Sequence, residues 1–131
     1  MGTLSSTDLT NIALDYKNLG DQLMSYLNQN TGNVTSLQYI DISNRISTIY
    51  HNATLLGALA TYQTVEDLST PIANINQAST TINAALQTIA DVQRIIDIAT
   101  TVVNLGTSIL TFNVNDIATN AGTLIHQLNQ N

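Results

Sequence analysis

The sequence contains no cysteine and no tryptophan, and it has one proline and one phenylalanine among 131 residues. The absence of cysteine excludes disulfide bonds, thiolate metal sites and cysteine nucleophiles. A chain of this length can bury a substantial core, and we expect residues 1–131 to fold as a single domain.

Charge is also scarce. Charged residues make up 9% of the chain, against about a quarter in a typical soluble protein. The only lysine and arginine residues are Lys17, Arg45 and Arg94, and the formal net charge is −6. Binding to nucleic acid needs clustered lysine and arginine, because these residues neutralise phosphates. The sequence therefore argues against nucleic acid, and we expect no nucleic acid partner.

Amide and hydroxyl side chains take the place of charge. Thr, Asn, Gln and Ser account for 53 of the 131 residues, so we expect a polar but largely uncharged surface. This composition is similar to that of subunits of secreted filaments and of extracellular helical proteins, which favours an extracellular or surface-associated location. The N-terminal residues lack the apolar stretch of a signal peptide, so we expect none.

Residue patterns for catalysis and metal binding are missing. Glu66 is the only glutamate, and no histidine follows it at the spacing of a di-iron ligand pair. The only histidines are His51 and His126, which we expect to face solvent or a helix end. No glycine-rich phosphate loop, nucleophile motif or carboxylate pair occurs. We therefore expect a protein that is not an enzyme and holds no metal and no cofactor.

Apolar residues recur in steps of three and four along most of the chain, which predicts α-helices. Strand-like alternation is never sustained over more than four residues. The expected fold is all-α, an antiparallel up-down-up-down four-helix bundle with coiled-coil-like heptad packing. The helices are expected at about 6–29, 36–66, 71–112 and 115–128.

The third predicted helix has a branched apolar residue at every seventh position. A repeat of this kind is typical of a seam along which helices pack together. The predicted core seam consists of Ile75, Ile82, Ile89, Ile96, Val103 and Leu110.

From residue 95 onward, the apolar surface of this helix widens to more than half of its circumference. One explanation is a continuous helix that overshoots the bundle and exposes an apolar head. The other is a break near Asn104 and Gly106, where glycine weakens the helix, so that the head folds back as core. The predicted interaction surface consists of Ile95, Ile98, Val102, Leu105, Ile109, Phe112, Val114 and Ile117.

Three functions are compatible with this pattern. The first is a non-catalytic helical-bundle protein that self-associates, or binds a protein partner, through the second half of the third helix. The second is a membrane-active protein whose apolar hairpin at 102–117 inserts into a lipid bilayer. The third is a carrier of a small apolar ligand inside the bundle.

Overall fold

The computed structural model describes residues 6–59, 69–89, 91–111 and 114–129, and these residues form five α-helices and no strand. The all-α prediction is therefore confirmed. The predicted number of four helices is wrong, because the predicted third helix is divided into two. The helices are α1 (Ser6–Gln29), α2 (Ser36–Leu59), α3 (Ser69–Thr88), α4 (Val92–Leu110) and α5 (Val114–Asn129).

Most helix boundaries agree with the sequence pattern. The helix predicted at 6–29 coincides with α1, and the helix predicted at 115–128 coincides with α5 to within one residue at each end. In α2 the described residues end at Leu59, so the end predicted at 66 lies outside the described residues.

Asp91 explains why the predicted third helix is divided. Its backbone is extended (φ −85°, ψ 112°), and its carboxylate accepts a hydrogen bond from the backbone N–H of Gln93 at 3.0 Å. This is an N-cap, which begins a new helix after Asp91. The break predicted near Asn104 and Gly106 is wrong, because α4 is continuous through both residues.

The connection between α1 and α2 is set by local hydrogen bonds. At the end of α1, the Asn30 side chain donates to the Tyr26 carbonyl at 2.8 Å. Thr35 and Gln38 then form a reciprocal capping box. The backbone N–H of Gln38 donates to Thr35 Oγ1 at 3.1 Å, and the backbone N–H of Thr35 donates to Gln38 Oε1 at 2.9 Å. These contacts stop α1 and begin α2 within a few residues, so the two helices form a tight hairpin.

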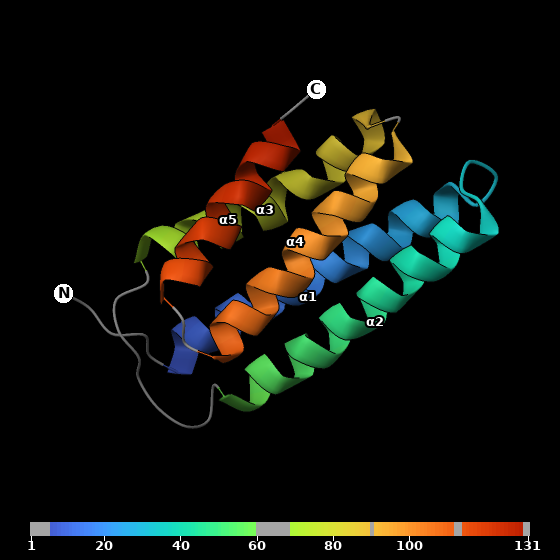
Figure 1. The fold of residues 1–131 in the computed structure, drawn as a ribbon. Helices are drawn as coiled ribbons and strands as arrows, with labels where there is room; N and C mark the ends of the chain where they lie inside the picture. Colours follow the sequence, from blue (N-terminus) through green and yellow to red (C-terminus); the bar gives the residue numbers. More distant parts are fainter. Residues whose placement is uncertain (1–5, 60–68, 90, 112–113, 130–131) are drawn as a thin grey trace.

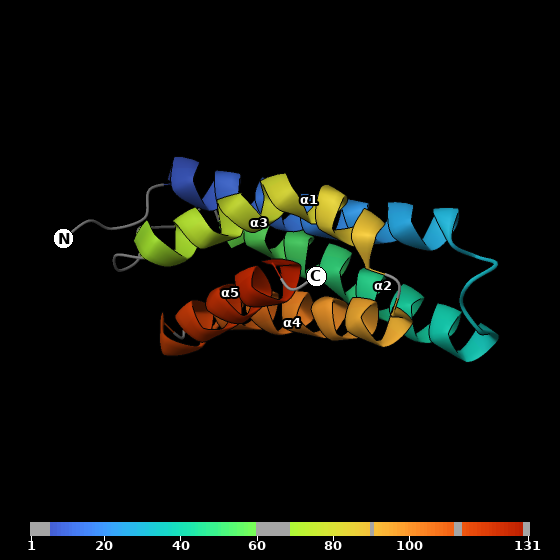
Figure 2. The same ribbon diagram turned by 90° about the horizontal axis from the view of Figure 1, so that it is seen from above.

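The five helices surround a common core. Helix α1 packs on α2 and α3, α2 packs on α4, α4 packs on α5, and α5 packs on α3, which closes a ring; α1 also contacts α4. The loop end of the α1–α2 hairpin extends beyond the other three helices (Figures 1 and 2). The continuous helix that would overshoot the bundle, one of the two alternatives for this segment, does not occur, because α3 ends at Thr88 and a separate helix, α4, begins at Val92.

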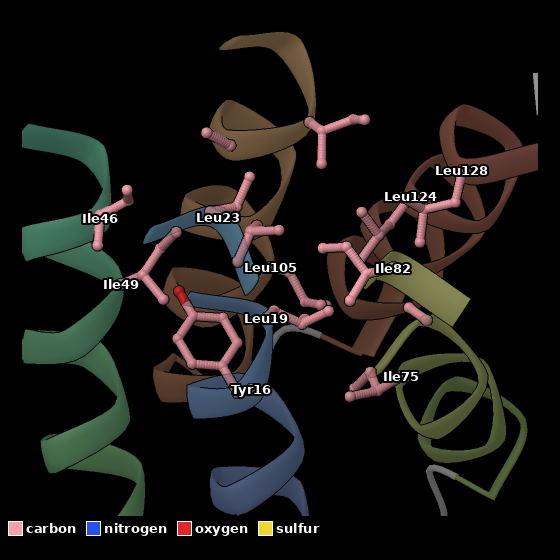
Figure 3. Packing of buried hydrophobic residues seen from close by; sticks show 14 of the residues in the cluster. Tyr16, Leu19, Leu23, Ile46, Ile49, Ile75, Ile82, Leu105, Leu124 and Leu128 are labelled. Carbon is pink, nitrogen blue, oxygen red and sulfur yellow. The ribbon is translucent and has the colours of Figure 1, made fainter. Parts of the chain in front are cut away.

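All five helices contribute side chains to one hydrophobic cluster (Figure 3). The predicted seam residues belong to this cluster, but they come from α3 and α4 and not from one continuous helix. The first four, Ile75, Ile82, Ile89 and Ile96, are buried. Val103 and Leu110 are half-buried and pack against the cluster.

Gly106 lies where α4 approaches a buried polar contact between α1 and α2. The Asn52 side chain donates to the Tyr16 hydroxyl at 3.4 Å, and both residues are buried. A Cβ atom at Gly106 would collide with the Tyr16 hydroxyl and lie 3.0 Å from Asn52 Nδ2. Burial raises the pKa of Tyr16 well above its usual value, so this phenol stays neutral. Gly106 is therefore needed for packing, although it lowers the helix propensity of α4.

We expect Gly106→Ala to destabilise the protein by about 1–3 kcal/mol, because the added methyl group overpacks the contact between Tyr16 and Asn52. Helix propensity alone predicts the opposite sign, a gain of about 1 kcal/mol. The matched control is Gly122→Ala, since a Cβ there meets nothing within 4 Å. Urea unfolding measures both variants, and a Gly106→Ala protein as stable as the control would contradict the packing.

Candidate functional site

Six of the eight residues predicted as an interaction surface are buried in the core of the chain itself. Helix α4, which carries most of them, lies against α1, α2 and α5. These contacts account for the wide apolar face of α4 within a single chain. A partner or a bilayer would reach the six side chains only if the helices separated. They are Ile95, Ile98, Val102, Leu105, Ile109 and Ile117; the side chains of Phe112 and Val114 lie outside the described ones.

The most exposed large apolar side chain of the described residues, Leu37, lies at the loop end of the α1–α2 hairpin. Leu37 is 80% exposed and Ile40 is 54% exposed, and their spacing of three places them side by side on the first turns of α2. Tyr39, which is 39% exposed, and the half-buried Val34 line one hollow together with Ile40. We call these four residues the hairpin patch. Among the residues whose burial the structure describes, the other exposed large apolar side chains, Leu14 and Leu55, lie elsewhere on α1 and α2.

A hollow of ≈ 260 Å³ adjoins the hairpin patch. Its apolar wall comes from Val34, Tyr39 and Ile40, and its polar rim comes from the loop and the α2 N-terminus. The full lining is Thr31, Val34, Thr35, Ser36, Tyr39 and Ile40. The patch therefore combines an exposed projecting side chain, Leu37, with an apolar recess.

The electrostatics of the hairpin end differ from those of the whole protein. No charged residue occurs in the segment 22–40, although the net charge of the chain is −6. The next charge along the chain, Asp41, is paired with Arg45, whose Nε lies 2.8 Å from the Asp41 carboxylate. The surface around the patch is consequently close to neutral.

A polar cluster at the middle of the hairpin joins α1 to α2. The Tyr50 hydroxyl donates to Asp21 at 2.7 Å, and Lys17 Nζ lies 3.3 Å from the same carboxylate and 5.9 Å from the Tyr50 ring centroid. Gly20 permits the close approach, since a Cβ there would lie 2.8 Å from an Ile49 methyl carbon. Burial, and then the nearby Asp21 carboxylate, raise the pKa of Tyr50 to about 12. This cluster fixes the base from which the hairpin end projects.

The described residues contain no group of three or more His, Cys, Asp or Glu side chains placed to hold a metal ion. His51 is exposed on α2, and His126 is exposed in the last turn of α5. Among the described residues, no helix is long and apolar enough to cross a membrane.

The sequence pattern contained a signal for the hairpin patch. Leu37 and Ile40 are apolar, but they do not belong to the stripe of Ile42, Ile46 and Ile49 that packs into the core. Tyr39 fits the spacing of that stripe, yet it is 39% exposed because the hairpin end extends beyond the other helices. Apolar residues outside the stripe, near a helix end, indicate an exposed patch.

Comparison of the chain with protein-family models, with curated proteins and with solved structures finds no match.

We expect the stability of the protein to fall as the pH rises from about 10 toward 12. The pKa of Tyr50 is raised from 10.0 to about 12, so the unfolded chain loses this proton first and alkaline pH favours unfolding. Tyr50→Phe removes this proton and should therefore lose less stability over the same interval. At neutral pH the variant should be less stable by about 1 kcal/mol, because the hydrogen bond to Asp21 is lost. Urea unfolding at several pH values measures the free energy of unfolding of both proteins. If that free energy fell equally steeply with pH in both, the Tyr50 proton would not be linked to stability.

Proposed function

We propose that this protein is a non-catalytic helical interaction protein that self-associates through the hairpin patch. The observation that carries the proposal is the exposure of Leu37 and Ile40, at 80% and 54%, on the part of the fold that projects furthest. Large apolar side chains gathered on a projecting surface are typical of protein interaction sites. The proposal keeps the function expected from the sequence but moves the surface from α4 to the α1–α2 hairpin.

The charge distribution favours a second copy as the occupant. Two copies of a protein with a net charge of −6 repel each other in most relative orientations. The segment 22–40 carries no charge, so contact between two hairpin ends brings no like charges together. Apolar association at this point is opposed least by electrostatic repulsion.

The shape of the patch also suits a symmetric dimer. In a two-fold contact the same surface serves both subunits, so a projection on one copy must fit a recess on the other. Leu37 supplies the projection, and the ≈ 260 Å³ hollow beside Tyr39 and Ile40 supplies the recess. We propose that Leu37 of each copy occupies the hollow of the other.

The size of the patch limits the affinity. A stable interface usually buries about 800 Å² on each partner, whereas the hairpin patch consists of four side chains. We therefore expect a weak dimer whose population depends on protein concentration.

The test is sedimentation equilibrium of the full chain over a range of concentrations. We expect the average mass of the native protein to rise from that of a monomer toward that of a dimer. Leu37→Asp and Ile40→Asp should each weaken association by about tenfold or more, since each places a charge in the apolar contact. The matched control is Leu14→Asp, because Leu14 is 60% exposed on α1 outside the patch, and it should associate as the native protein does.

Circular dichroism verifies that each variant keeps its helices. A native protein that stays monomeric at every concentration would contradict the proposal, as would a Leu37→Asp protein that associates normally. Dye release from lipid vesicles by the native protein, lost in Leu37→Asp, would assign the patch to a membrane surface instead and would also overturn the proposal.

A further inference from the structure

A second hollow, of ≈ 190 Å³, lies between the C-terminal halves of α1 and α3. Side-chain amides dominate its lining, and no charged residue takes part. The amides are those of Gln22, Gln29, Asn30, Asn83 and Gln87. Beneath them, the buried side chains of Leu86 and Ile89 provide an apolar floor.

Several polar groups in this hollow have unused hydrogen-bonding capacity within the described part of the chain. Gln22 and Gln87 each donate through Nε2 to an asparagine oxygen at 3.3 Å, and Gln29 donates to Ser25 Oγ at 3.1 Å. Their three carbonyl oxygens have no donor among the described residues. Asn83 accepts the bond from Gln87, which leaves its amide nitrogen as a donor.

Tyr26 adds a hydroxyl to the same hollow. The residue is 7% exposed and lines the hollow, and its hydroxyl has no hydrogen-bond partner among the described residues. The hydroxyl is not among the enclosed polar atoms that lack a partner, so solvent reaches it, and a ligand in the hollow could take the place of that water. Burial raises the pKa of Tyr26, which keeps the phenol neutral and able to donate.

We propose that this hollow is a binding site for one ring of a neutral sugar. Sugar hydroxyls both donate and accept, which matches a lining that offers three amide carbonyls, one amide nitrogen and one phenol. The absence of charged lining residues disfavours ionic ligands. The volume of ≈ 190 Å³ is below the about 300 Å³ at which sites for larger ligands begin, so one ring is the size that fits. The apolar floor is suited to the C–H face of such a ring.

The site is separate from the hairpin patch, which lies on α2 and on the loop before it and contributes none of its lining. Sugar binding therefore goes beyond self-association, and either proposal can fail without the other.

The test is NMR titration of the ¹⁵N-labelled protein with glucose, galactose, mannose and N-acetylglucosamine, with glycerol as a reference. We expect at least one sugar to bind with a millimolar Kd and to shift the side-chain amide signals of Asn83 and Gln87. Tyr26→Phe keeps the aromatic ring and removes only the hydroxyl, and it should weaken binding roughly fivefold, as the loss of one hydrogen bond predicts. The double variant Asn83→Ala with Gln87→Ala should abolish measurable binding.

The matched control is Asn44→Ala, which removes an exposed amide from α2 and should leave the Kd unchanged. The bound sugar is then compared with a trisaccharide that ends in the same unit. Tighter binding of the trisaccharide supports a site for the end of a glycan chain, and weaker binding supports a site for the free sugar.

The proposal is overturned if none of the four sugars shifts these signals, or if the double variant binds as the native protein does. It is also overturned if glycerol shifts the same signals as strongly as the sugars, because the hollow would then collect small hydroxyl compounds without recognising a ring.

Discussion

The burial of α4 is the constraint on which the rest of the structure depends. Its apolar face is too wide for a position at the edge of a bundle, and it is covered by α1, α2 and α5. To place α4 in this position, the chain reverses at Asp91 instead of continuing from α3. After this reversal, α3, α4 and α5 have 20, 19 and 16 residues, whereas α1 and α2 have 24 each. The longer pair, α1 and α2, forms the projecting hairpin.

Hydrogen bonds between uncharged side chains join neighbouring helices in this protein. The Asn18 side chain joins α1 to α3 by donating to Ser79 at 2.9 Å, and the Asn120 side chain joins α5 to α4 by donating to Ser108 at 2.8 Å. The ion pairs Lys17–Asp21 and Arg45–Asp41 each lie within one helix, where such pairs contribute little. These contacts give some of the many amide and hydroxyl side chains a structural role. The scarcity of charge also leaves the neutral surfaces on which both proposed binding sites depend.

The sequence was sufficient to predict the helices and much of the core, because both follow from the spacing of apolar residues. It did not reveal the break, since Ile82, Ile89 and Ile96 keep a spacing of seven across it and the Asp91 cap is a local hydrogen bond. The hairpin patch and the amide-lined hollow depend on how far helices extend past one another and which ones lie together. Periodicity along the chain does not determine either property.

The apolar face of α4 forms the inner core of a single chain. Native-state hydrogen exchange measured by NMR tests it most directly, because it reports the free energy needed to expose each backbone amide. We predict that the amides of residues 98–109 exchange only through global unfolding and are among the most protected in the protein. Exchange of these amides through a smaller opening, while α1 and α2 remain protected, would show that α4 separates from the core and would contradict the account.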